Sequence, residues 1–106
     1  MDNLFVLPDG LSGEQEFFED LHASAGVRIE RIISKGHTTP PGEWYDQDED
    51  EWVALLEGDA AIAYDDGSSV NLSPGDYLYI PAHRRHRVAR TSADPVCVWL
   101  AVHIKG

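Results

Sequence analysis

Hydrophobic and polar residues alternate along most of the chain from Val27 onward, and a two-residue period is typical of strands that bury one face. The pattern predicts strands over Val27–Ile33 and over Glu51–Leu56, where Glu51, Val53 and Leu55 would share a face. Further strands are predicted over Ala60–Tyr64, Ser69–Leu72, Tyr77–Ile80, His86–Thr91 and Val96–Ile104. The last of these is apolar on both faces, which indicates a central position in a sheet.

Turn signatures rich in Gly, Pro and Asp separate these segments. Glu57-Gly58-Asp59, Asp65-Asp66-Gly67-Ser68 and Ser73-Pro74-Gly75-Asp76 are the clearest, and Lys35–Gly42 is predicted to be a loop. Roughly eight or nine short strands at intervals of about ten residues are typical of an antiparallel sandwich or a small jelly-roll barrel. The chain is therefore predicted to be all-β after its first quarter.

The N-terminal segment has a different pattern. Asn3–Leu7 is predicted to be a short strand, and Ser12 with Gln15 forms a capping pair that predicts a short helix ending at Ala25-Gly26. We expect one domain, with residues 1–26 as an N-terminal arm with a short helix and residues 27–106 as a β-barrel, because a chain of 106 residues holds a single core.

Composition and charge narrow the classes of partner. A net charge of −11 argues against nucleic acid and anionic membranes, both of which would repel the chain. No apolar run reaches the roughly 18 residues of a membrane helix, and Leu4–Leu7 is too short for a leader core. The single cysteine, Cys97, excludes an internal disulfide and is expected to be buried and inert. A soluble, cytoplasmic protein with a small-molecule ligand is expected.

Charged residues gather in two loops. Six of the nineteen acids lie in Glu43–Glu51, and four of the eight basic residues lie in Arg84–Arg90. Both loops are simply solvated in one interpretation. If they are neighbours, some of their charges would pair, each exposed pair contributing about 0–1 kcal/mol, and spare arginines at a rim would attract an anionic ligand.

The same two stretches carry the candidate chemistry. Six residues separate Glu51 from Gly58, five separate Gly75 from Pro81, and four separate Pro81 from His86. These spacings resemble the two motifs of the cupin superfamily, with His83 where the second motif has a glycine. The resemblance extends from Val27 to the C-terminus. It implies the cupin double-stranded β-helix, which is a jelly-roll barrel in which Glu51 and His86 meet.

The resemblance also implies a divalent metal ion, of unknown identity, held in many cupins by a His-x-His pair, a glutamate and a second-motif histidine. Counted back from Glu51, the His-x-His positions fall on Tyr45 and Gln47. The implied ligands are therefore Glu51, His86, Gln47 and Tyr45, an oxygen-rich set. In the metal-free alternative, Tyr45 is a wall residue and Gln47 a hydrogen-bonding residue of the cavity.

Two mechanisms fit these residues. A metal would polarise a carbonyl while His86 or Tyr45 moves a proton; without a metal, His86 backed by Glu51 would be the base and Tyr45 the acid. The second arrangement is similar to that of sugar-nucleotide epimerases of the superfamily. Either serves isomerase, lyase or decarboxylase chemistry on a small, polar, anionic molecule. A non-enzymatic module that binds or senses a small ligand is the alternative.

Other residues have secondary roles in this prediction. Trp44 and His37 are expected to line the ligand pocket, whereas His83 is expected to be an exposed loop residue and His103 a residue of the outer sheet face. The apolar last strand and Leu4–Leu7 are expected to mediate a homodimer.

Overall fold

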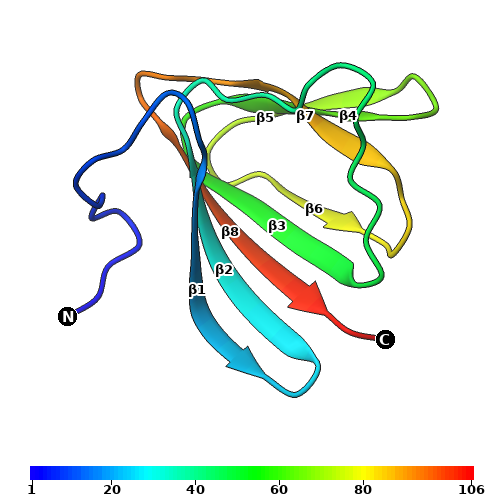
Figure 1. Cartoon of the computed structure of the whole chain (residues 1–106), viewed down its shortest axis with the longest axis horizontal. Helices are drawn as coiled ribbons and strands as arrows, with labels where there is room; N and C mark the ends of the chain where they lie inside the picture. The colour runs from blue at the N-terminus through cyan, green and yellow to red at the C-terminus, as the bar shows by residue number, and fades with distance from the viewer.

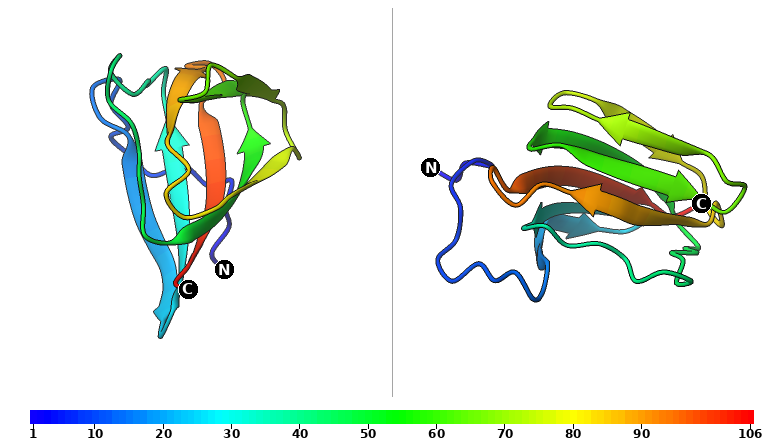
Figure 2. Two further views of the ribbon diagram at one scale, coloured as in Figure 1. Left: turned by 90° about the vertical axis from the view of Figure 1, so that its right-hand side faces the viewer. Right: turned by 90° about the horizontal axis from the view of Figure 1, so that it is seen from above.

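The computed structural model describes residues 1–106, which form two antiparallel sheets and no helix. The larger sheet has the strand order β1-β2-β8-β3-β6 and the smaller one the order β5-β4-β7. Figures 1 and 2 show the smaller sheet lying across one end of the larger. The strands are β1 (Phe17–Ser24), β2 (Val27–Ser34), β3 (Asp50–Glu57), β4 (Ala60–Tyr64), β5 (Ser69–Leu72), β6 (Tyr77–Ile80), β7 (His86–Thr91) and β8 (Cys97–Ile104).

From β2 onward the predicted strands are confirmed to within a residue or so at each end. Alternation along β3 buries Glu51, Val53 and Leu55, which are 8%, 4% and 0% exposed. The last strand is central, as predicted, because β8 pairs with β2 on one side and β3 on the other. The core between the sheets is formed by Val53, Leu55, Ala60, Ile62, Leu72, Ile80, Cys97, Trp99 and Ala101.

The predicted N-terminal helix is wrong. Phe17–Ser24 is instead strand β1, which pairs with β2 through a tight turn whose Gly26 has a φ of +82°. An isolated helix shorter than about 12–15 residues is marginal in water, whereas a strand beside β2 satisfies its backbone groups in an existing sheet. The part of the chain that precedes the first strand is therefore residues 1–16 and not the predicted arm of residues 1–26.

The predicted strand Asn3–Leu7 is also absent. This segment lies against β2, where the buried Arg31 donates hydrogen bonds from Nη1 to the carbonyl oxygens of Leu4 (3.2 Å) and Val6 (2.7 Å). A guanidinium has five donors and no acceptor. The Arg31 side chain therefore binds the two backbone carbonyl oxygens that would otherwise be available to pair with a neighbouring strand.

The turn between β3 and β4 joins the two sheets and requires glycine. Gly58 has a φ of +89°, and a Cβ placed there would lie 2.8 Å from both Cys97 Sγ and Ser92 Oγ. Cys97 is buried, as predicted, and its thiol donates to the carbonyl oxygen of Asp59 at 3.2 Å. Close packing at this corner sets how the smaller sheet folds over the larger one.

The chain has no helix with the length and hydropathy needed to cross a membrane. On the outer surface, Phe5, Val6 and Leu7 are exposed, while Leu100 and Val102 of β8 are half-buried. The homodimer through these segments stays a prediction, and the mass in solution at micromolar concentration tests it.

Candidate functional site

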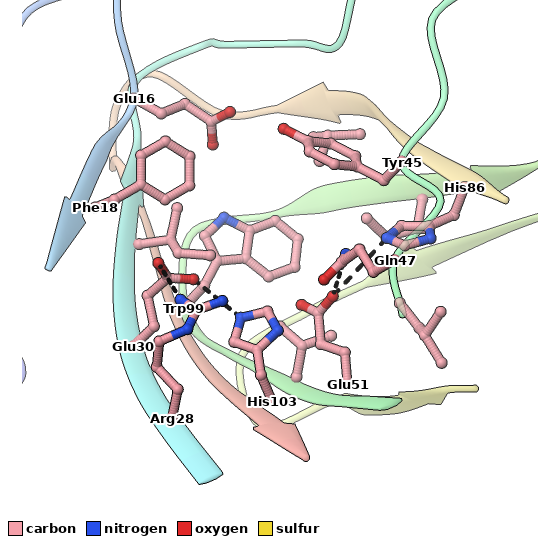
Figure 3. A pocket seen from close by; sticks show the side chains of 15 residues that line it. Glu16, Phe18, Arg28, Glu30, Tyr45, Gln47, Glu51, His86, Trp99 and His103 are labelled. Atoms are coloured by element: carbon pink, nitrogen blue, oxygen red, sulfur yellow. Dashed lines mark hydrogen bonds and ion pairs between the residues drawn. The ribbon is translucent and has the colours of Figure 1, made fainter. Parts of the chain in front are cut away.

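A cavity of about 240 Å³ lies between the two sheets. It is smaller than most drug-sized ligand pockets, which measure roughly 300–1,000 Å³, so a small ligand fits best. Side chains from both sheets and from the loop before β3 line it, as Figure 3 shows. The lining residues are Glu16, Phe18, Arg28, Glu30, Ile32, Tyr45, Gln47, Glu51, Val53, Ile62, Ile80, His86, Val88, Trp99 and His103.

The structure brings Glu51 of β3 and His86 of β7 together from opposite sheets. His86 Nε2 lies 3.9 Å from Glu51 Oε1, and the two residues are 5% and 8% exposed. His86 Nδ1 lies 2.8 Å from the carbonyl oxygen of Arg84, which can only accept, so Nδ1 carries the proton and Nε2 faces the cavity. The Gln47 amide donates to Glu51 Oε1 at 3.1 Å.

Tyr45 also lies in this wall, because the loop before β3 pairs locally with β7. Tyr45 and His86 exchange backbone hydrogen bonds of 2.8 and 3.2 Å, and their rings stack with centroids 5.6 Å apart. Extended backbone alternates its side chains, so Tyr45 and Gln47 point inward together. Burial, followed by the nearby carboxylates of Glu16 and Glu51, raises the pKa of Tyr45. The phenol is therefore protonated at neutral pH and can donate a proton.

Trp44 and His37 do not line this cavity. Trp44 instead lines a neighbouring surface hollow, which shares Glu16 and Tyr45 with the cavity, and the Arg87 guanidinium lies 6.0 Å from the Trp44 ring centroid. His37 Nδ1 accepts a hydrogen bond from the backbone N–H of Lys35 at 2.8 Å, and its other ring nitrogen is buried without a partner. The structure thus separates these two residues from the four that converge.

His83 is exposed, as predicted, and has the left-handed φ of +65° at the position where the motif has glycine. Its Nδ1 lies 2.7 Å from Asp46 Oδ1, and this hydrogen bond raises the pKa of the imidazole. A hydrogen-bonded side chain helps an ordinary residue hold a conformation that glycine adopts freely.

A second acid–imidazole pair was missed by the sequence reasoning. His103 was expected on the outer face, but the structure places it inside, 4% exposed, with Nε2 3.1 Å from Oε1 of the buried Glu30 on β2. It shares the inward face of β8 with Cys97, Trp99 and Ala101, which are 0%, 4% and 0% exposed. The two-residue period of β8 was the available signal.

Glu30 and His103 each shift the pKa of the other. The hydrogen bond to Glu30 raises the pKa of His103, outweighing burial, which lowers it. For Glu30, burial raises the pKa, but the hydrogen bond from His103 and the charge of Arg28 together bring it below the ordinary value. His103 Nδ1 is buried without a partner, on the side of the ring that faces Glu51 in Figure 3. Glu51 is also the cross-strand neighbour of His103.

The charges differ from expectation. The acidic loop pairs with His83, through Asp46 and Asp48, and with Arg28, through Glu49, but not with the arginines of residues 84–90. Three arginines of residues 84–90 pair elsewhere, and the fourth lies over Trp44; none lines the cavity. These pairs are Arg84–Asp66, Arg85–Asp65 and Arg90–Asp59. The arginine rim that led us to expect an anionic ligand is therefore absent.

The residues present do not fit a tightly held divalent metal. Nowhere in the chain do three His, Cys, Asp or Glu side chains form a group that could hold an ion. Gln47 turns its amide N–H toward Glu51, and the raised pKa of Tyr45 opposes the phenolate that a metal would need. Of the four implied ligands, only Glu51 and His86 are of the usual type, so no step below is routed through a metal.

Comparison with known proteins agrees with the fold. The model of the Cupin domain family matches residues 30–103, so the chain belongs to the cupin family. A Ralstonia eutropha JMP134 protein provisionally named mannose-6-phosphate isomerase is 44% identical, with a TM-score of 0.92 over 100% of this chain and 98% of that one.

More distant solved structures share the fold alone. A cupin superfamily protein of Desulfitobacterium hafniense DCB-2 has a TM-score of 0.75 at 21% identity, covering 92% of this chain and 84% of that one. The Schizosaccharomyces pombe Cnp3 cupin domain has a TM-score of 0.75 at 9% identity, covering 91% and 65%. A search among curated proteins gave no match.

Proposed function

We propose that this cupin isomerises a small hydroxy-carbonyl compound by acid–base proton transfer. The observation that carries the proposal is the buried meeting of Glu51 and His86, 3.9 Å apart at the cavity wall, with the Tyr45 ring stacked on the imidazole. A base, its charge partner and an acid thus face one small space, which is what moving a proton between neighbouring atoms requires.

The proposed roles follow from the hydrogen bonds. With Nδ1–H held by the Arg84 carbonyl, His86 Nε2 has a free lone pair and takes the proton from the carbon next to the substrate carbonyl. The imidazolium that forms is stabilised by the carboxylate of Glu51. Tyr45 donates its proton to the carbonyl oxygen, which gives an enediol. Tyr45 then takes back the proton of the neighbouring hydroxyl, and His86 returns its proton to the former carbonyl carbon.

The provisional name of the 44% identical relative supports isomerase chemistry over lyase or decarboxylase chemistry. The lining of the cavity, however, argues against a phosphorylated substrate for this chain. The cavity is lined by three carboxylates, those of Glu16, Glu30 and Glu51, and by one arginine, Arg28. That arginine is shared by Glu30, Asp20 and Glu49, at 3.1, 3.5 and 3.6 Å. A phosphate would enter a space of its own sign.

Hydrogen–deuterium exchange tests the proposal. The protein is incubated in D₂O with a panel of unphosphorylated aldoses and ketoses, and deuterium at the carbon next to the carbonyl is followed by NMR. Exchange should depend on both His86 and Tyr45, so His86→Gln and Tyr45→Phe should each lower its rate by about 10²–10⁴-fold. His22→Gln, at an exposed position of β1, is the matched control and should leave exchange unchanged.

Two results would count against catalysis. If wild-type protein binds a sugar of the panel without exchanging its proton, the chain is a binding module. If exchange persists in His86→Gln at the wild-type rate, the base has been assigned to the wrong residue.

A further inference from the structure

The free groups that face the cavity are mainly hydrogen-bond acceptors. Glu16 uses Oε2 to accept from the Ser34 hydroxyl at 2.6 Å, which leaves Oε1 free. Glu51 uses Oε1 to accept from Gln47, which leaves Oε2 free. His103 Nδ1 is buried without a partner in the wall beside Glu51.

Carboxylates outnumber guanidinium groups in the cavity lining. Glu16, Glu30 and Glu51 each contribute a carboxylate, and Arg28 contributes the one guanidinium. The one lining arginine is engaged by three carboxylates, two of which lie outside the cavity lining. In a space bounded by apolar walls, uncompensated carboxylates favour a ligand that carries positive charge.

Aromatic rings complete the lining. Phe18 and Tyr45 lie near the carboxylate of Glu16 in Figure 3, and Trp99 also lines the cavity. The negative face of an aromatic ring attracts a cation, and the attraction is stronger when the cation is partly desolvated. Carboxylates beside aromatic faces are thus complementary to an ammonium group, which has three donors and no acceptor.

From this arrangement we infer that the cavity binds a small polyol or sugar bearing a protonated amine, and that Glu16 is the residue that recognises the amine. Glu16 precedes β1 and lies outside both cupin motifs. Its carboxylate faces the Tyr45 hydroxyl across the opening of the cavity in Figure 3, so an amine bound there lies beside the proton-transfer residues. The inference rests on the proposed function in that it concerns the same cavity. It does not require catalysis, because binding can be measured without turnover.

Three six-carbon polyols that differ in charge test the inference. D-glucamine is cationic, D-sorbitol neutral and D-gluconate anionic at pH 7.5, and their affinities are measured by calorimetric or NMR titration. We expect glucamine to bind about tenfold tighter than sorbitol, the factor for one charge-assisted hydrogen bond, and gluconate to bind most weakly.

Variants assign the preference to one residue. Glu16→Gln, which can still accept from Ser34, should lower glucamine affinity about tenfold and leave sorbitol affinity unchanged. Glu14→Gln, at an exposed position outside the cavity, removes the same charge and should change neither affinity. Thermal melts establish that both variants fold.

The inference fails if glucamine does not bind, if sorbitol or gluconate binds as tightly, or if Glu16→Gln behaves as Glu14→Gln does. Its failure is distinguishable from failure of the proposed function. If the protein shows no preference for glucamine but still exchanges protons on neutral sugars, only the inference of amine recognition is refuted. If it binds glucamine but exchanges no protons on any sugar, only the proposed catalysis is refuted.

Discussion

The cavity contains two acid–imidazole pairs, and they are built differently. The motif pair, Glu51 and His86, joins opposite sheets at 3.9 Å, with His86 Nε2 free toward the cavity. The sheet pair, Glu30 and His103, joins neighbouring strands of one sheet through a hydrogen bond of 3.1 Å. The free nitrogen of His86 reaches the cavity, where a substrate can use it, whereas the free nitrogen of His103, Nδ1, is buried in the wall. The same two residue types thus suit chemistry in one pair and packing in the other.

The largest expected effect is on the rate of proton exchange, which should depend far more on the motif pair than on the sheet pair. His86→Gln should lower proton exchange by about 10²–10⁴-fold, the usual contribution of a positioned acid or base. His103→Gln, which can still donate to Glu30, should lower it by less than about tenfold. Rates from NMR under identical conditions check both variants, and equal losses would erase the distinction between the pairs.

The next effect separates the pairs by stability. Glu30→Ala leaves His103 and Arg28 without their buried partner, and breaking a buried pair in this way costs about 3–5 kcal/mol of unfolding free energy. Glu51→Ala breaks one hydrogen bond from Gln47 and a looser ion contact, for which about 1–2 kcal/mol is expected. Chemical denaturation measures both free energies. A Glu51 variant as unstable as the Glu30 variant would contradict this ranking.

The motif pair can be converted into a metal site. Tyr45→His combined with Gln47→His restores the His-x-His pattern beside Glu51 and His86, which gives four ligands of the usual kind. The double variant should bind Co²⁺ with visible absorption bands and gain about 2.7 kcal/mol of stability at 100 times the dissociation constant. The wild-type protein, measured in parallel, should show neither change. Stoichiometric Co²⁺ binding by the wild type would overturn our conclusion about its donor set.

The smallest effect is on the pH dependence of stability. The pKa of His103 is raised above its ordinary value of 6.5, so its contribution is fully present below pH 6.5 and is lost as pH rises through the folded-state pKa. Glu30 has a pKa lowered from 4.5, so its contribution is present above pH 4.5 and is lost as pH falls through the folded-state pKa.

The sheet pair therefore stabilises the fold most between about pH 4.5 and 6.5, the ordinary values of its two groups. Between pH 6.5 and 8, wild-type protein should lose more unfolding free energy than His103→Gln does. Denaturant titrations at a series of pH values measure this slope. Identical slopes would show that His103 does not titrate differently in the folded state.

Much of this fold was predictable from local pattern. The strands from β2 to β8 follow the two-residue period and the turn signatures, and the spacings around Glu51 and His86 predicted that the two side chains would meet. Counting back from Glu51 also identified Tyr45 and Gln47, which do line the cavity. These features depend on intervals along the chain, which the sequence states directly.

What the sequence by itself determined is the set of β-strands after the N-terminal segment and the residues of the motif pair. Only the tertiary structure decided that Phe17–Ser24 is a strand, that His103 faces Glu30, and that Glu16 reaches the cavity. Periodicity tells which residues share a face, but not which face another part of the chain covers. That choice depends on contacts between residues far apart in sequence, such as the 73 positions between Glu30 and His103, and on whichever sheet edge is open to pairing.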